Sequence, residues 1–596
     1  MRACENGDTR VRNLVAELLW FHQRSQKPGW WALFERQTWS EDELVDDAES
    51  LGGLQVDTAT PAIQVKRSLD VSYVFPPQDT KLRVGDTPRI AETLGYSGTI
   101  VELSPEDGRI VLRRGMKAED MPQRFSLVPA PINLQSVPDA VIAFAERFVR
   151  GPTEADQALL DILMRRVPRL RGRAAGFPIR NPGEPLSEAV IRAVMDLDHS
   201  YLFIQGPPGT GKTYTAAQTI IALLRAGKRV GVSSNSHKAI NKLLLETEKH
   251  AKTFGFRFSG VKKGNKDDPE TEFNGLNIMT VFDSQEVSLE YRLVGGTVFH
   301  FSRDDQRGGY DYLFVDEAGQ VSLGHLVAMA GAAANIVLVG DQMQLPQPVQ
   351  GVHPGETGRS SLEYLLEDKA TVSENRGILL NETRRLHPAL CAFISEAIYD
   401  GRLEAHPITA KRHLVLRPGA SAVLRPAGLS FVPVAHDGCT QSSRAEAEAI
   451  AALVAELQTH RIVRDGKESL ITLDDILVVA PYNLQVNLLK RLLPQGAHVG
   501  TVDKFQGQEA AVVIVSMTTS KGVEAPRGTE FLFNPNRFNV AVSRAQCLAL
   551  VVHAVELLEG AWTKIDDLRR LNLFAHAEAI ALQPVPNPNP STNSPC

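Results

Sequence analysis

Residues 206–213 read Gly-Pro-Pro-Gly-Thr-Gly-Lys-Thr and match the phosphate-binding pattern G-x-x-x-x-G-K-[ST] in full. An apolar run at 201–205 precedes this loop, and a stretch with helical character follows at 214–224. In that context backbone N–H groups, the lysine charge and the helix dipole all favour phosphate. We predict that Lys212 contacts the β and γ oxygens of a nucleoside triphosphate and that Thr213 binds Mg²⁺. The predicted nucleotide-binding residues of the loop are Gly206, Pro207, Pro208, Gly209, Thr210, Gly211, Lys212 and Thr213.

Two other stretches imitate a switch GTPase. Asp316–Gln320 reads D-E-A-G-Q, which fits D-x-x-G followed by glutamine, and Asn265–Asp268 reads N-K-D-D, which fits the guanine-binding N-K-x-D. In a GTPase the guanine motif lies downstream of D-x-x-G, whereas here it lies upstream. The order of the motifs therefore argues against a GTPase.

The same acidic stretch is better interpreted as the end of a second strand. The apolar run at 312–315 leads into Asp316 and Glu317, about a hundred residues after the phosphate loop. Transfer of a phosphoryl group to water needs one carboxylate for the metal and another for the attacking water. We predict that Asp316 binds Mg²⁺ and that Glu317 polarises the water.

A third apolar run decides the class. Residues 336–340 lead into Asp-Gln-Met-Gln-Leu-Pro at 341–346, which resembles motif III (G-D-x-x-Q-L-x-P) of superfamily 1 helicases. Segments 383–388, 499–509 and 536–545 then resemble later helicase motifs in the right order. The chain is most similar to superfamily 1B helicases of the nonsense-mediated-decay and Okazaki-processing type. It resembles most closely the helicase part of prokaryotic fusions with a RecB-like nuclease.

The resemblance implies an α/β fold with two RecA-like parallel-sheet lobes, preceded by a helical stalk and a small β-barrel. It makes Gln344 the residue that senses the γ-phosphate, with ATP and Mg²⁺ as ligands. Cations that arrive from a second lobe accelerate hydrolysis by about 10³ to 10⁵, and Arg385 and Arg544 are the predicted pair. Further nucleotide contacts are expected from Arg384, Gly507 and Glu509.

The resemblance also implies a track for a single strand of nucleic acid. Ser234, Ser236 and His237 correspond to motif Ia and Thr297 to motif Ic, while Tyr482 and Gln485 follow the apolar run at 476–480. Taken alone, each of these residues is more typical of a helix cap or a turn than of a strand contact. The partner expected from the resemblance is single-stranded DNA in preference to RNA, and a nuclease module or subunit is a second candidate.

Composition limits the class further. The 596 residues contain 64 Lys+Arg and 70 Asp+Glu, so the chain is mildly acidic, unlike many nucleic-acid binders. A narrow track of hydroxyls and backbone amides does not require a basic chain. Five scattered cysteines without C-x-x-C argue against structural zinc, and we see neither a membrane span nor a signal peptide. We expect a cytoplasmic protein without membrane contact.

Changes of pattern along the chain suggest six regions. The expected regions are a helical stalk at 1–57, a small β-barrel at 58–135 with a hairpin at 99–113, stalk helices at 136–184, lobe 1 at 185–368, lobe 2 at 369–575, and a disordered proline-rich tail at 576–596.

Some features depart from the family pattern. No glutamine stands at 185–190 to bind adenine, and Arg384 replaces the tyrosine expected to stack on the base. We find no D…E-x-K nuclease pattern, so a helicase-only chain and a fragment both remain open. Two other functions also remain open: an RNA or RNA-protein remodelling motor, and a nucleotide-gated binding module that does not unwind.

Overall fold

The apolar runs that precede the nucleotide-binding motifs form parallel strands in the computed structural model, which describes residues 2–581 except 117–121, 132–133, 135, 267, 348, 465 and 506. The sheet of lobe 1 has eight strands in the order β11-β10-β12-β9-β13-β14-β8-β15. Its central strands are buried on both faces, as is typical of a parallel sheet between helices. The strands are β8 (Tyr201–Gln205), β9 (Val230–Ser233), β10 (Gly260–Lys263), β11 (Ile278–Val281), β12 (Leu293–Gly295), β13 (Tyr310–Val315), β14 (Ala333–Gly340) and β15 (Gly377–Leu379).

Helices cover both faces of this sheet. One apolar core joins it to α6, α7 and α8, and the other joins it to α5, α10 and α11. The helices are α5 (Gln157–Leu163), α6 (Leu186–Met195), α7 (Lys212–Arg225), α8 (His237–Thr253), α9 (Val298–Phe301), α10 (Leu323–Ala330) and α11 (Ser361–Leu366), with 3₁₀ turns η1 (Glu154–Asp156), η2 (Pro269–Thr271), η3 (Ser284–Glu286), η4 (Asp304–Gln306) and η5 (Ala318–Gln320). Because all strands run the same way, the segments that follow them meet at one edge of the sheet.

Lobe 2 repeats this architecture with a five-stranded parallel sheet in the order β19-β25-β24-β22-β23. The predicted fold of two parallel-sheet α/β lobes is therefore confirmed. Its strands are β19 (Gly428–Val434), β22 (Ile476–Val479), β23 (His498–Gly500), β24 (Ala510–Ser516) and β25 (Ala545–Ala554). Its helices are α12 (Pro388–Ile398), α13 (Arg444–Leu457), α14 (Asn483–Leu492), α15 (Thr529–Leu532), α16 (Pro535–Val542) and α17 (Ile565–Ala581), with 3₁₀ turns η6 (Pro407–Lys411), η7 (Leu473–Asp475) and η8 (Gly522–Glu524).

The chain does not pass from lobe 1 to lobe 2 at the expected boundary, residue 368. β15 pairs with β8 through Gly377, Ile378 and Leu379, so the chain is still part of the lobe 1 sheet ten residues beyond that boundary. After β15 the chain leaves this sheet: Glu382 and Thr383, before α12, pair in parallel with Glu404 and Ala405, after α12. Smaller strands here and at the lobe 2 rim are β16 (Glu382–Thr383), β17 (Glu404–Ala405), β18 (His413–Val415), β20 (Arg461–Arg464) and β21 (Lys467–Leu470).

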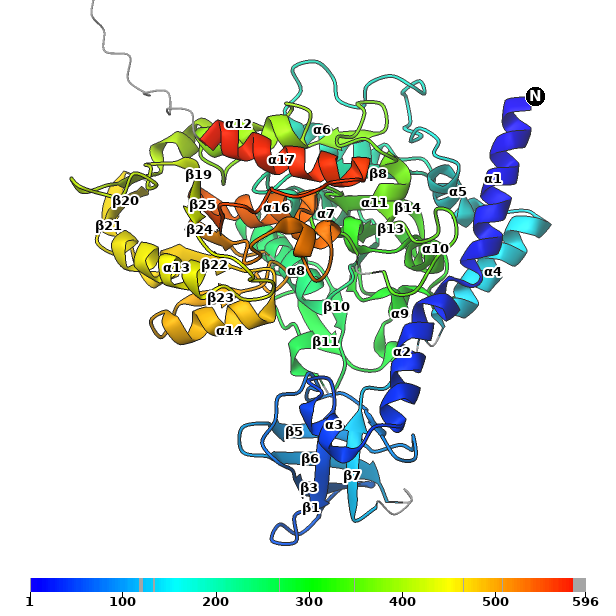
Figure 1. Ribbon diagram of the computed structural model, residues 1–596. Coiled ribbons are helices and arrows are strands. Elements are labelled where there is room, and N and C mark those ends of the chain that lie inside the picture. Colours follow the sequence, from blue (N-terminus) through cyan, green and yellow to red (C-terminus); the bar gives the residue numbers. More distant parts are fainter. Residues whose placement is uncertain are drawn as a thin grey trace, which may run out of the picture.

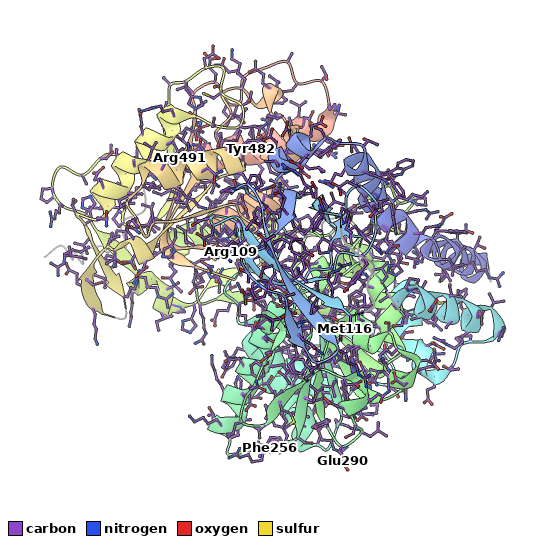
Figure 2. All side chains as sticks on the ribbon, turned by 90° about the horizontal axis from the view of Figure 1, so that it is seen from below. Arg109, Met116, Phe256, Glu290, Tyr482 and Arg491 are labelled. Atoms are coloured by element: carbon purple, nitrogen blue, oxygen red, sulfur yellow. The ribbon has the colours of Figure 1, made fainter. Side chains whose placement is uncertain are left out.

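An antiparallel sheet with its own apolar core forms a separate body below the lobes (Figure 1). Its first strand, β1, lies within the region expected to be helical, because Leu51 and Leu54 face the same core as Phe125. β5 and β6 form the expected hairpin. Figure 2 views this body from below, with Arg109 as the first residue of β6 and Met116 just after its last. The strands are β1 (Leu51–Val56), β2 (Ile63–Val65), β3 (Ser68–Val74), β4 (Arg89–Ile90), β5 (Thr99–Ser104), β6 (Arg109–Gly115) and β7 (Arg124–Val128).

The remaining helices flank the antiparallel sheet in sequence. α1 (Arg2–Leu18), α2 (Phe21–Gln37) and α3 (Glu41–Asp46) run along one side of lobe 1 toward the antiparallel sheet, and α4 (Val137–Arg150) returns beside α1 (Figure 1). α17 continues to Ala581, so 576–581 are helical where a disordered tail was expected. The proline-rich residues from 582 and Gln506 of the predicted motif V lie outside the described residues. None of the helices in the described part of the chain is both long and apolar enough to cross a membrane.

Candidate active site between the two lobes

The phosphate loop turns between β8 and α7. Gly209 and Gly211 have φ angles of +76° and +80°, a conformation that favours glycine. A Cβ on Gly206 would lie 2.0 Å from Cγ of Lys212, so the loop closes tightly over the lysine stem. Nζ of Lys212 donates a hydrogen bond to the carbonyl of Gly206. The loop is thus folded as a cradle around an amine that can turn to a phosphate.

The two carboxylates at the end of β13 have different surroundings. Asp316 is almost fully buried, whereas Glu317 lines the cavity beside the phosphate loop. The backbone N–H of Glu317 donates to Oδ1 of Asp316 at 3.0 Å. Burial and the adjacent charge of Glu317 raise the pKa of Asp316 well above its usual range. A divalent cation held by Asp316 and Thr213 would offset both effects, so the donor set fits Mg²⁺.

Residues of lobe 2 close the other side of the cavity. Arg385 forms an ion pair with Glu509 and donates to the carbonyl of Ser543 at 3.3 Å. The chain before Arg385 touches the phosphate loop directly: Oγ1 of Thr383 donates to the carbonyl of Pro208 at 2.8 Å. A Cβ on Gly209 would lie only 2.3 Å from Cβ of Arg385. The phosphate loop and the predicted catalytic arginine are therefore in contact across the lobe boundary.

Arg544 lines the same cavity but is engaged elsewhere. Its guanidinium donates to the carbonyls of Val502 at 2.9 Å, Gln508 at 3.3 Å and Phe505. Burial, followed by the charge of Arg385, lowers the pKa of Arg544 to about 10. In this conformation Arg544 stabilises the loop after β23, and it must exchange carbonyl partners before it can contact a phosphate.

Motif III connects the two lobes. Gln344 lines the cavity and donates to Oδ2 of Asp341 at 2.9 Å. Asn536 of α16 donates to the carbonyls of Gln342 and Gln344 at 2.8 and 2.7 Å, and Asn539 donates to the carbonyl of Met343 at 2.7 Å. A shift of α16 would therefore move the loop that carries Gln344.

These groups enclose a cavity of about 550 Å³ between the lobes. Of the predicted catalytic residues it brings together Lys212, Glu317, Gln344, Arg385 and Arg544. Other predicted residues in its lining are Pro207, Pro208, Gly209, Thr210, Gly211, Thr213 and Gly507.

Three predicted nucleotide contacts lie outside the cavity lining. Arg384 is 69% exposed with its guanidinium 4.0 Å from Glu382, and it does not line the cavity in this conformation. Glu509 is held by Arg385 and Gln546, and Gly206 lies under Lys212.

Sequence reasoning missed one wall of the cavity. α8 presents residues at spacings of three and four, which form one face of a helix. That periodicity is visible in the sequence, but no motif marks it. The missed lining residues of α8 are Lys242, Leu245, Glu246 and Lys249, and Tyr214 of α7 joins them.

Four of the six predicted strand contacts lie at the edge of the lobe 1 sheet. Ser234, Ser236 and His237 follow β9, and Thr297 follows β12, the strand that pairs with β9. Ser236 caps α8, since its hydroxyl accepts from the N–H of Ala239. The structure therefore brings these two motifs side by side.

The two candidates in lobe 2 differ from this expectation. Gln485 is fully buried, accepts from the N–H of Ser443 and donates to Oγ of Ser516. It fixes α14 to α13 and is not available to a strand, so that prediction is wrong for this conformation. Tyr482 is only 5% exposed and its ring packs beside Phe531; in Figure 2 it marks the start of α14, with Arg491 near its end.

Both lobes match known sequence families. Two sequence families, each described as an AAA domain, match residues 188–350 and 357–556, one for each lobe. The chain is an ATP-hydrolysing helicase of superfamily 1 type, similar to superfamily 1B members. These matches do not support the expected closer resemblance to prokaryotic fusions with a RecB-like nuclease.

Individual relatives of the helicase are distant. It is 27% identical over 383 residues to the DNA replication ATP-dependent helicase/nuclease JHS1 of Arabidopsis thaliana, covering 61% of this chain and 28% of the relative. It is 25% identical over 408 residues to the DNA-binding protein SMUBP-2 of Mesocricetus auratus, covering 58% and 40%. The helicase thus spans well under half the length of these relatives. An arterivirus helicase solved with DNA is 14% identical, with a TM-score of 0.40 over 85% of this chain and 80% of that one.

Proposed function

We propose that this chain couples ATP hydrolysis to movement along single-stranded DNA, in the 5′ to 3′ direction, and thereby separates duplexes. The observation that carries the proposal is the cavity between the lobes, which is lined by the phosphate loop, Glu317 and Gln344 from lobe 1 and by Arg385 from lobe 2. A site built from two lobes changes when the lobes move, so hydrolysis and movement are linked.

Each residue has a definite part in this proposal. The phosphate loop and Lys212 bind the triphosphate, and Thr213 and Asp316 hold Mg²⁺, which when bound neutralises charge on the phosphate oxygens. Glu317 accepts the proton of the attacking water. Arg385 stabilises the charge that develops on the γ-phosphoryl group. Gln344 reports the state of the site to α16 through the motif III loop.

The choice of DNA rests on the relatives, whose printed names include DNA replication and DNA binding. The 5′ to 3′ direction rests on the family resemblance. Because JHS1 is named a helicase/nuclease, a nuclease module or subunit is a candidate partner. The alternatives are a remodelling motor for RNA and a nucleotide-gated binding module that does not unwind.

Strand displacement distinguishes these functions. Duplexes of DNA and of RNA, each with a 5′ or a 3′ single-stranded tail, are incubated with ATP or a non-hydrolysable analogue, and Lys212→Ala is the control. We expect the strand of the 5′-tailed DNA duplex to be displaced with ATP and not with the non-hydrolysable analogue. Displacement of RNA only would establish the remodelling motor, and tight binding without displacement or hydrolysis would establish the binding module.

A further inference from the structure

β10 buries a lysine completely. Lys262 is fully enclosed, and among the described residues no carboxylate forms an ion pair with it. Its Nζ instead lies 2.8 Å from Nδ1 of His237, 2.9 Å from the carbonyl of Thr271 and 3.2 Å from the carbonyl of Lys263. An ammonium group has three donors and no acceptor, so these three partners use all of its hydrogen-bonding capacity.

This arrangement determines the tautomer of His237. Because Lys262 only donates, Nδ1 of His237 accepts, and the proton of a neutral imidazole must lie on Nε2. Burial, followed by the charge of Lys262, lowers the pKa of His237 to about 4, so the ring is neutral near pH 7. Burial lowers the pKa of Lys262 to about 8, which leaves its ammonium form predominant at pH 7.

Lys262 lies beneath both predicted strand-binding motifs of lobe 1. It pairs in register with Gly295 of β12, just before Thr297, and a Cβ on Gly295 would lie 3.2 Å from its Cδ. His237 begins α8, a helix of 17 residues whose N-terminus favours an anion. The neighbouring Ser234 is 4% exposed, and its hydroxyl has no partner within the described part of the chain.

The stretch that imitates a guanine-binding motif supports the lysine. The N–H of Asn265 donates to Oγ1 of Thr271 at 2.7 Å, and the side chain of Asp268 caps the 3₁₀ turn that ends at Thr271. Asn241 of α8 donates to the carbonyl of Glu272 at 3.0 Å. These bonds hold the Thr271 carbonyl, and hence Lys262, against α8.

We propose that Lys262 is a positioning residue for strand binding: it fixes His237 in the tautomer whose Nε2–H donates to a phosphate oxygen of a single strand. This role rests on the proposed function and specifies which part of the nucleic acid the motif Ia edge recognises. Phosphate is favoured over a base because the helix N-terminus and the ammonium both attract an anion. Such a contact is independent of base sequence.

Two isosteric replacements of His237 test the tautomer. The amide of glutamine reaches the place of Nε2 and can donate outward, whereas the amide of asparagine reaches only the place of Nδ1. We expect His237→Gln to bind oligo-dT within about threefold of wild type. His237→Asn should bind about tenfold more weakly, as for the loss of one hydrogen bond to a charged group. Equal affinity of the two variants would overturn the proposal.

A double-mutant cycle tests Lys262 itself. Lys262→Met should weaken oligo-dT binding in the wild type but not in the His237→Asn background, since the two residues act through one contact. Equal weakening in both backgrounds would show a merely structural role and refute the proposal. The matched control is Lys263→Met, because Lys263 donates to the carbonyl of Gly264 and not to His237. If the wild type itself fails to bind strand, the proposed function fails and this role fails with it.

Discussion

At the scale of single residues, Glu317 has an unusual backbone conformation that its sequence motif does not predict. Its φ of +51° places it in the left-handed region, which residues other than glycine rarely adopt. Such conformations persist where the surroundings enforce them, often at functional sites. Here the bend after β13 directs Glu317 to the cavity while Asp316 stays buried below.

Replacing Glu317 by glutamine should leave ATP and strand binding intact and lower ATP turnover by about 10² or more, because the amide cannot accept the proton of water. Nucleotide binding and steady-state hydrolysis measure the two effects separately. Glu246→Gln is the matched control, since Glu246 lines the same cavity but forms an ion pair with Lys249. Near-normal turnover of Glu317→Gln would remove Glu317 from its role.

Residue types could be predicted better than residue partners. The spacing of the motifs identifies Lys212, Glu317 and Arg385, and the structure brings all three to one cavity. The spacing of the motifs could not reveal that Arg544 donates to three carbonyls or that Gln485 is enclosed between α13 and α14. Both outcomes depend on neighbours 31 to 42 residues away in sequence, which single motifs do not encode.

At the scale of elements, α16 of lobe 2 is hydrogen-bonded to the motif III loop of lobe 1. Asn536 and Asn539 hold the motif III loop through three carbonyls, and Tyr399 completes the network by donating to Oδ2 of Asp341 at 2.7 Å. The motif order predicts both segments, but the contact between them follows only from the packing of the lobes.

Asn536→Ala should therefore reduce the stimulation of ATPase by single-stranded DNA more than it reduces the basal rate. Each bond that it removes stabilises by about 1 kcal/mol, enough to loosen the loop without unfolding a lobe. Asn572→Ala, at an exposed position of α17, is the control. Equal reduction of basal and stimulated rates would argue against coupling through α16.

At the scale of the whole molecule, the two lobes meet at the phosphate loop. The alternation of apolar runs and helices predicts both sheets, whereas the domain boundaries near 57 and 368 need correction. β1 pairs with β7 and β15 with β8, so each joins its sheet through a strand distant in sequence. Composition and periodicity do not specify such pairings. The contact of Gly209 with Arg385 likewise exists only because the lobes close.

In the proposed function, a strand-dependent closure of the two lobes drives ATP hydrolysis. Its most direct test is the steady-state ATPase rate of the wild type, Arg385→Ala and the control Arg412→Ala, with and without oligo-dT. Arg412 is a neighbouring arginine that donates to the carbonyl of Arg384 outside the cavity. We expect several-fold stimulation of the wild type and of Arg412→Ala, and a loss of about 10³ or more in Arg385→Ala. A wild-type rate indifferent to oligo-dT, or an Arg385→Ala rate close to the wild type, would contradict the account.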